Sequence, residues 1–217
     1  MNRLMNGYGT RLPAVAMLAG ALVAGAACGK AVRESRASSY LIVENLLAAS
    51  GAQPAKFSNT LESDVVTNVK STVGGQQVLV PTVYEDVGQV SLKIAMKDPG
   101  TTDSPTSPSP TNEITVNRYR VVYTRADGRN TPGVDVPYAF DGAATGTVSA
   151  NGTSLTFILV RAQAKFDPPL KALAGGGDRI VISTFAEVTF YGRDQAGNDV
   201  SVVARISVNF ADWGDPQ

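Results

Sequence analysis

The stretch that decides the fold is IVISTFAEVTFYGRDQAGNDVSVVARISVNF, residues 180–210. In each half, apolar residues recur at every second position, a period typical of a β-strand with one face in a core and one in water. The apolar face of the first half holds Ile180, Ile182, Ala186, Val188 and Phe190, and that of the second half holds Val200, Val202, Ala204, Ile206, Val208 and Phe210. The stretch therefore predicts two long neighbouring strands.

The turn between these strands has the sequence DQAGN. If the two residues before Gly197 form a type I turn and Gly197 takes a positive φ, which glycine tolerates at little cost, a short hairpin loop results. This loop pairs Phe190 with Val202. It also pairs Ala186 with Ile206, so both apolar faces lie on the same side of the hairpin.

Other segments show strand features less strongly. Strands are predicted at residues 62–70, 77–84, 90–96 and 113–124, and at residues 145–149 and 153–163. Asn151-Gly152, between the last two segments, is a strong hairpin signal, and Pro81 places its own segment at a sheet edge or a bulge. Seven or eight short strands, mostly linked by hairpins, predict a mainly β fold, an antiparallel sandwich.

Residues 39–51, SYLIVENLLAASG, predict the single helix. Apolar residues at 42, 43, 46 and 47 follow helical spacing, Ser39 can cap the start and Gly51 can close the end. The polar face carries no lysine or arginine, so this amphipathic helix is expected to pack on the following domain rather than in lipid. The predicted order is then a helix and linker over residues 39–60, the sandwich over residues 61–212 and a C-terminal tail over residues 213–217.

Residues 190–199, FYGRDQAGND, resemble the D-x-x-G-N turn that joins the last two strands of bacterial immunoglobulin-like domains in surface proteins. The resemblance implies an immunoglobulin-like or fibronectin-like β-sandwich. Those families are mainly extracellular spacers, adhesion modules and accessory domains, and most of them are not enzymes. The resemblance implies no binding site at particular residues of this chain, which also carries longer insertions than those domains.

The N-terminal segment has the layout of a secretory signal peptide. Arg3 and Arg11 accompany an almost wholly apolar run at residues 12–25, and small residues stand directly before Cys28. With the chain's single cysteine in this place, the segment resembles the lipobox of bacterial lipoproteins, although Gly25 stands where leucine is usual. The resemblance implies cleavage before Cys28, attachment to its thiol of a diacylglyceryl group that carries fatty acids such as palmitate, and acylation of the new amino terminus.

Other interpretations of this leader stay open. Ordinary cleavage after the A-x-A-like residues 24–26 would release a soluble protein with an unpaired Cys28. An uncleaved anchor needs about 20 apolar residues, more than this run offers, and Pro13 interrupts its start. A buried core helix fits poorly, because the run is rich in glycine and alanine. We therefore expect a signal peptide over residues 1–27 and a tether over residues 28–38.

The charge balance limits the partners of the mature protein. The chain has 19 basic and 19 acidic residues, and the leader holds two of the basic ones, so the mature part is slightly acidic. No basic field attracts nucleic acid, and no polybasic patch holds anionic lipid. Membrane attachment would come from acyl chains on Cys28, since two or three chains anchor stably. In the lipoprotein resemblance, Gly29 replaces the Asp that retains some Gram-negative lipoproteins at the inner membrane, which favours the outer membrane or cell surface.

The residue types that the chain lacks limit its chemistry. It has no histidine, and Cys28 is its one cysteine. This excludes Ser-His-Asp and Cys-His nucleophilic sites and histidine-based metal sites. The triple glycine at residues 175–177 precedes a predicted strand, whereas a phosphate-binding loop precedes a helix. The carboxylates show no pairing of the kind that glycoside hydrolysis needs. We expect neither catalysis nor a cofactor.

Two insertions differ in kind. Residues 98–112 are mostly Pro, Ser and Thr and predict an exposed mobile loop, whereas residues 125–142 mix charges with aromatic side chains. Long loops with little regular structure are often functional. The possible ligand contacts of the second loop are Asp127, Asp135, Tyr138, Phe140 and Asp141. The alternative is that its two aromatic rings plug the end of the sandwich while its charges are solvated.

A weak calcium candidate lies in the hairpin turn, where Asp194, Asn198 and Asp199 supply oxygen ligands. The same residue types also favour turns for their local hydrogen bonds, and no D-x-D-x-D-G loop is present. The sequence thus predicts a non-catalytic, lipid-anchored protein of the cell envelope that spaces or binds another envelope protein or a glycan. The alternative is a carbohydrate- or calcium-binding accessory module that uses residues 125–142.

Overall fold

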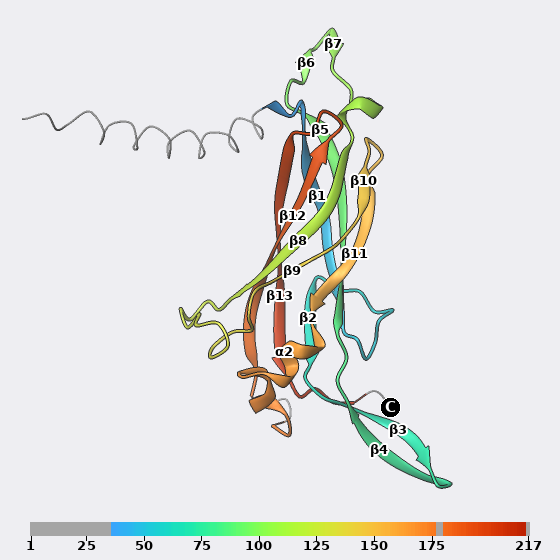
Figure 1. Cartoon of the computed structure of the whole chain (residues 1–217), viewed down its shortest axis with the longest axis vertical. Coiled ribbons are helices and arrows are strands. Elements are labelled where there is room, and N and C mark those ends of the chain that lie inside the picture. The colour runs from blue at the N-terminus through green and yellow to red at the C-terminus, as the bar shows by residue number, and fades with distance from the viewer. Residues whose placement is uncertain (1–35, 177–179, 216–217) are drawn as a thin grey trace, which may run out of the picture. The chain divides into compact units, whose positions relative to one another are not determined.

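The computed structural model describes residues 36–176 and 180–215, and its compact unit begins at Ala37 (Figure 1). The predicted signal peptide, Cys28 and most of the predicted tether lie outside the described residues. The described part is mainly β, as the sequence predicts. None of its helices is long and apolar enough to cross a membrane.

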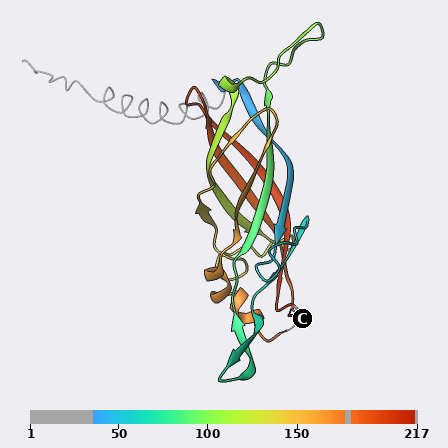
Figure 2. The same ribbon diagram turned by 90° about the vertical axis from the view of Figure 1, so that its right-hand side faces the viewer.

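Two main sheets face each other in a sandwich-like arrangement (Figures 1 and 2). The three-stranded sheet has the order β1 (Ser39–Ala49), β5 (Asp86–Met96) and β11 (Thr153–Val160). The larger sheet has the order β10 (Gly146–Val148), β8 (Ile114–Thr124), β12 (Ile182–Asp194), β13 (Asp199–Ala211) and β2 (Thr60–Asp64), and β9 (Phe140–Gly142) also pairs with β8. The smaller elements are the β3 (Thr67–Val73) and β4 (Gln76–Thr82) ribbon, β6 (Gly100–Thr101), β7 (Ser104–Pro105), η1 (Pro110–Asn112), α2 (Ala162–Phe166) and η2 (Leu170–Leu173).

The hairpin of β12 and β13 confirms the prediction in detail. Phe190 pairs with Val202 and Ala186 pairs with Ile206, the predicted register. Gly197 has a φ of +83° and donates its N–H to the Asp194 carbonyl over 3.0 Å, which closes the loop. The described strand begins at Ile182, so only Ile180 departs from the predicted apolar face; it precedes the strand and is exposed.

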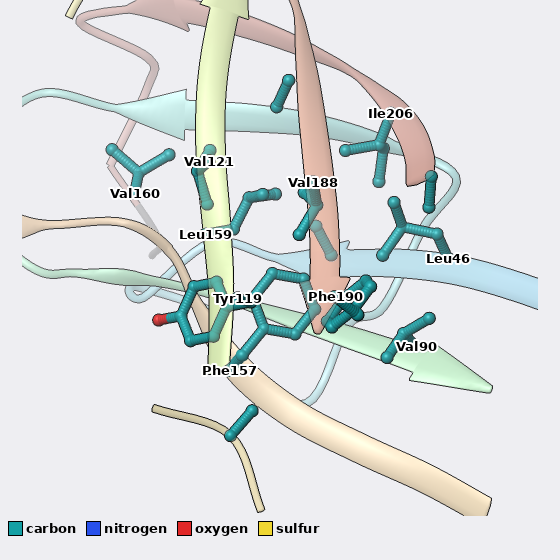
Figure 3. Packing of buried hydrophobic residues seen from close by; sticks show 14 of the residues in the cluster. Leu46, Val90, Tyr119, Val121, Phe157, Leu159, Val160, Val188, Phe190 and Ile206 are labelled. Atoms are coloured by element: carbon teal, nitrogen blue, oxygen red, sulfur yellow. The ribbon is translucent and has the colours of Figure 1, made fainter. Parts of the chain in front are cut away.

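The core lies between the two sheets. Apolar side chains of β5 and β11 meet those of β8, β12 and β13 in one cluster of buried residues. Tyr119 lies 5.0 Å from Phe157 and Phe157 lies 5.2 Å from Phe190, measured between ring centroids, so aromatic rings connect the sheets (Figure 3). Burial of each such side chain contributes roughly 1.5–3 kcal/mol to stability.

The helix expected over residues 39–51 is wrong, because this segment forms strand β1 of the three-stranded sheet. The register shifts at a bulge between Val43 and Asn45. Leu41 and Val43 face the core before this bulge, and Leu46 and Ala48 are buried after it. The extra residue of a bulge breaks the period of two, so the apolar positions take on a helix-like spacing. Residues 39–60 therefore begin the sandwich instead of preceding it.

One predicted strand and one predicted hairpin also differ from the structure. Residues 62–70 form the end of β2 and the start of β3 rather than one strand, and β2 runs parallel to β13, so the larger sheet is mixed. At Asn151-Gly152 the chain turns, with Gly152 donating its N–H to the Ser149 carbonyl. However, β10 pairs with β8 and β11 pairs with β5. This turn therefore carries the chain from one sheet to the other and does not close a hairpin.

The remaining predicted segments keep their character. Residues 114–124 of the segment predicted at 113–124 form β8, and residues 90–96 are part of β5. Pro81 lies in the two-stranded β3–β4 ribbon, where both strands are edges, as a proline in a strand requires. Residues 98–112 are largely exposed, as expected, and carry β6, β7 and η1.

Candidate functional site

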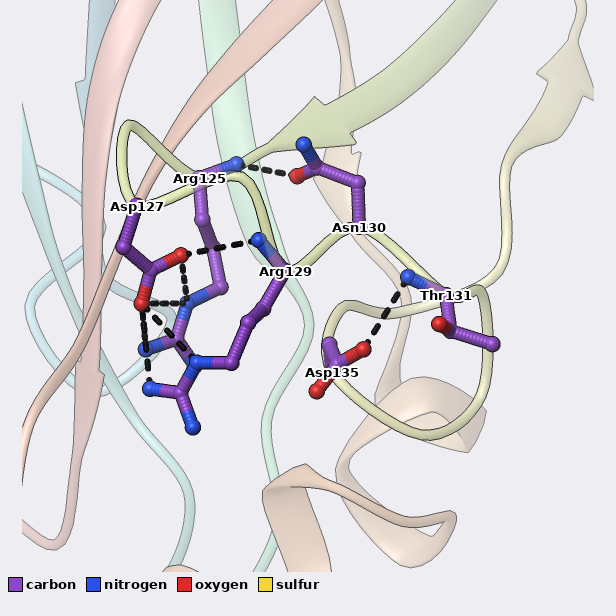
Figure 4. Close-up of polar contacts among 6 residues, drawn as sticks. All are labelled: Arg125, Asp127, Arg129, Asn130, Thr131 and Asp135. Carbon is purple, nitrogen blue, oxygen red and sulfur yellow. Dashed lines mark hydrogen bonds and ion pairs between the residues drawn. The ribbon is translucent and has the colours of Figure 1, made fainter.

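The loop at residues 125–142 satisfies most of its charges internally. Asp127 accepts hydrogen bonds from the guanidinium groups of Arg125 and Arg129, at distances down to 2.6 Å and 3.0 Å (Figure 4). The hydrogen bond from Arg125, followed by those from Arg129, lowers the pKa of Asp127 to about 2. Asp135 accepts a hydrogen bond from the Thr131 N–H over 3.2 Å. These carboxylates are therefore held by their own loop.

The two aromatic residues of this loop lie in different environments. The Tyr138 side chain is 57% exposed, and its ring occupies the space that a Cβ at Gly133 would need. Phe140 belongs to β9 and is buried, with its ring 6.2 Å from that of Tyr119. The prediction that both rings plug the sandwich thus holds for Phe140 only.

Asp141 is the third predicted carboxylate and faces another set of partners. It accepts hydrogen bonds from Arg118 over 2.9 Å and from Arg120 over 2.6 Å, both of which lie on β8. Asp127, Asp135 and Asp141 thus accept hydrogen bonds from different partners, and they are not grouped so that the three together could hold a metal ion. The five predicted contact residues therefore form no single cluster.

The side chains predicted as calcium ligands make hydrogen bonds and an ion pair within the hairpin itself. The carboxylate of Asp194 accepts hydrogen bonds from the backbone N–H groups of Ala196 and Asn198 and from the Asn198 side chain, over 2.8–3.0 Å. Asp199 forms an ion pair with Arg193 at 2.8 Å. Within the described residues, no three His, Cys, Asp or Glu side chains are grouped so that they could hold a metal ion.

A buried polar cluster joins α2 to the sandwich. Lys165 Nζ lies 2.9 Å from Asp86 Oδ2, with side-chain exposures of 1% and 0%. Asp86 also accepts hydrogen bonds from Ser63 Oγ over 2.6 Å and from the Gly51 N–H over 2.9 Å, and Lys165 donates a second bond to the Asp64 carbonyl over 2.7 Å. Sequence reasoning missed this cluster, since no local pattern marks a pair so far apart in the chain. Ser63, Asp86 and Lys165 are all buried.

Asp64 lies beside this cluster and is itself buried. Burial raises the pKa of its carboxyl group, while hydrogen bonds from Thr67 Oγ1 and the Trp213 N–H oppose the shift. Trp213, the first residue of the predicted C-terminal tail, is thereby fixed to the sandwich. Asp215 adds a second attachment through hydrogen bonds from the Asn68 backbone and side chain.

A groove opens where β9 and β11, from different sheets, approach each other. We call it the Arg161 groove; its walls include Tyr119, Phe140, Asp141, Phe157, Ile158 and Arg161, and its volume is about 420 Å³. Phe140 and Asp141 were predicted as contact residues, whereas Arg161 and the aromatic residues of β8 and β11 were not. The sequence around Arg161 and these aromatic residues predicts only strands. The packing of the two sheets brings the side chains together.

No protein-family model, no curated protein and no solved structure matches the chain.

Proposed function

We propose that the protein is a non-catalytic, lipid-anchored protein of the cell envelope whose immunoglobulin-like sandwich presents the β3–β4 ribbon to another envelope protein. The observation that carries this proposal is the unpacked apolar face of the ribbon. The signal-peptide layout and Cys28 support the anchor, on the outer membrane or cell surface. The turn resemblance supports the immunoglobulin-like assignment and its non-enzymatic use.

The ribbon has one apolar face. In its register Val69 lies opposite Val80 and Ser71 lies opposite Val78, while Val73 continues the same face toward the tip. Val73 is 61% exposed, and Val78 and Val80 are exposed as well. A two-stranded hairpin is marginally stable alone in water, and clustered exposed apolar side chains mark interaction surfaces. The valine face therefore suits a protein partner with an apolar surface of its own.

The position of the ribbon also favours presentation away from the anchoring membrane. Strand β1 enters the sandwich at Ser39, which pairs with Met96 at one end of β5. The ribbon leads into the opposite end of β5, at Asp86 (Figures 1 and 2). A strand of 11 residues spans roughly 35 Å. With the anchor ahead of Ser39, the sandwich acts as the spacer between membrane and ribbon.

Site-specific photocrosslinking tests this function. We would replace Val73 with p-benzoylphenylalanine in the full chain, expressed in its own cells, and identify the crosslinked product in membranes by mass spectrometry. We expect one product with a different protein. Its yield should fall roughly tenfold or more in Val78→Thr/Val80→Thr, because two valines lose apolar burial.

The matched control is Leu79→Thr, which lies on the opposite face of the ribbon across from Lys70 and should leave the product unchanged. A product made of two copies of this chain would replace the proposed partner with self-association. Equal yields from the double variant and the original sequence would overturn the proposal.

A second candidate is glycan binding by the loop at residues 125–142, which the exposed Tyr138 ring favours. Stacking on a sugar would require that ring, so Tyr138→Ala should abolish retention on a glycan array. Retention that survives this change would remove the candidate.

A further inference from the structure

We propose that the Arg161 groove binds a small organic anion, a carboxylate that carries an aromatic or aliphatic body. This inference does not depend on the proposed partner of the ribbon. It rests on the walls of the groove, on the state of the Arg161 side chain and on the hydrogen-bond donors that remain free there.

The walls of the groove are mainly apolar and aromatic. Tyr119 lies between Phe140 and Phe157, with ring centroids 6.2 Å and 5.0 Å away. The ring of Tyr119 occupies the space that a Cβ at Gly142 would need, so the glycine opposite Tyr119 on β9 makes room for it. Val87 adds an aliphatic side chain. Small-molecule sites are typically concave, mostly apolar and a few hundred Å³ in volume.

Arg161 supplies a positive charge that forms no ion pair within the part of the chain that the structure describes. Its guanidinium carbon lies 4.4 Å from the centroid of the Phe140 ring. Its Nε–H is shielded from solvent and has no hydrogen-bond partner within the described residues. Five other arginines in the described ranges, at positions 118, 120, 125, 129 and 193, form ion pairs with aspartates, and Arg205 forms one with Glu187. A buried donor without an acceptor is unfavourable, so the hydrogen bonding of the Arg161 side chain is incomplete in this structure.

The strand geometry fixes Arg161 at this place. The register of β11 shifts between Ile158 and Val160, so that Leu159 and Val160 are both buried. Arg161 follows directly and comes to lie in the wall of the groove. An arginine held by packing on an aromatic ring can offer its planar fork to a carboxylate in a defined direction.

Tyr119 adds a second donor. Its hydroxyl oxygen accepts a hydrogen bond from the Ile158 N–H over 3.2 Å, and its own proton has no acceptor within the described part of the chain. The pKa of this hydroxyl is raised, mainly by burial, so it stays protonated at neutral pH. A carboxylate could thus accept from both Arg161 and Tyr119.

The surrounding charges leave the groove positive. Asp141 lies in the wall, but it is already bound by Arg118 and Arg120. Glu85 acts on Tyr119 from an exposed position, and Asp167 lines a small neighbouring pocket together with Arg161. Among the described residues, neither carboxylate forms an ion pair with Arg161. Apolar walls with one cation select a ligand that is apolar along its length and negative at one end. A bare inorganic anion would use only part of such a site.

Calorimetric titration in detergent of the full protein, in the form that its own cells produce, tests the inference. The probes are 3-phenylpropionate and its uncharged amide, 3-phenylpropanamide. We expect the acid to bind about tenfold more tightly than the amide, because only the acid forms charge-assisted hydrogen bonds. Arg161→Gln should lower the affinity for the acid to that for the amide, while Arg161→Lys should keep part of the difference.

Arg205→Gln is the matched control, since it removes the same charge from an exposed pair with Glu187 and should leave both affinities unchanged. Equal affinities of the original protein for acid and amide would overturn the inference. So would the absence of binding of either probe at millimolar concentration, or an acid preference that survives in Arg161→Gln. If that variant does not fold, Arg161→Lys and the acid-to-amide ratio of the original protein still decide.

Discussion

At the scale of single residues, the fold depends on polar groups that the core contains as well as on apolar ones. The Lys165–Asp86 pair is buried on both sides, and each charged group has further hydrogen-bond partners. A buried pair of this kind is weak evidence of net stabilisation, but removal of one partner leaves an uncompensated charge. We therefore expect the Lys165–Asp86 pair to fix the position of α2 against β5 and to add little to the free energy of unfolding.

Changing one partner of this pair should be costly. We expect Lys165→Met to destabilise the protein by about 3–5 kcal/mol, because Asp86 then remains charged and buried. Asp86→Asn should cost a similar amount for the reverse reason. The combined variant should lose clearly less than the sum of both, since neither charge remains. Urea unfolding measures all three, and strictly additive losses would show that the two side chains do not act as a pair.

The buried carboxyl group of Asp64 should give stability a defined pH dependence. Its folded pKa lies above the ordinary value of 3.8, chiefly through burial. Between these two pKa values the folded protein therefore holds a proton that the unfolded chain releases. The contribution of this carboxyl group to the free energy of unfolding is complete below pH 3.8 and is lost as the pH rises through the folded pKa. Relative to Asp64→Asn, the original protein should lose stability with rising pH in that window.

Asp127 provides a control, because its effect on stability should change with pH in the opposite direction. Hydrogen bonds from Arg125 and Arg129 lower its pKa to about 2 from 3.8. Relative to Asp127→Asn, the original protein should gain stability as the pH rises between these values, by a small amount because the group is exposed. Urea unfolding at a series of pH values measures both differences. Slopes of the same sign for the two aspartates would contradict the assigned environments.

At the scale of elements, local patterns identified strands well where one face alone is buried. The alternation in β12 and β13 and the turn at Gly197 gave the correct register, because hairpin pairing is local. Strand β1 was misread as a helix, since its bulge spaces apolar residues as a helix does. At Asn151-Gly152 the predicted turn is correct, but the predicted hairpin is wrong, because β10 and β11 pair with strands of different sheets.

Two substitutions distinguish the strand from the helix at this position. Leu41 is 5% exposed and Ile42 is 37% exposed, whereas the helical spacing would bury Ile42. Leu41→Ala should cost about 2–5 kcal/mol, and Ile42→Ala should cost clearly less. Denaturant unfolding of both variants checks the order. A larger loss of stability in Ile42→Ala than in Leu41→Ala would contradict the strand and favour the helix.

At the scale of the whole molecule, the sequence predicts the class of fold but little of the groove. The aromatic residues and Arg161 come from strands β8, β9 and β11, and sheet packing alone places them together. Of the predicted contact residues, Phe140 and Asp141 line this groove, while Asp127 and Asp135 are held by their own loop. Periodicity reports which face of a strand is buried, but it does not report which strands become neighbours across the sandwich.

Anchoring by Cys28 is the claim on which the envelope assignment and the spacer role both depend. The most direct measurement is mass spectrometry of the N-terminal peptide from protein purified from its own membranes. We expect this peptide to begin at Cys28, with a diacylglyceryl group bound to its sulfur as a thioether and with an acylated amino terminus. An unmodified Cys28, or residues 1–27 still attached, would contradict the claim.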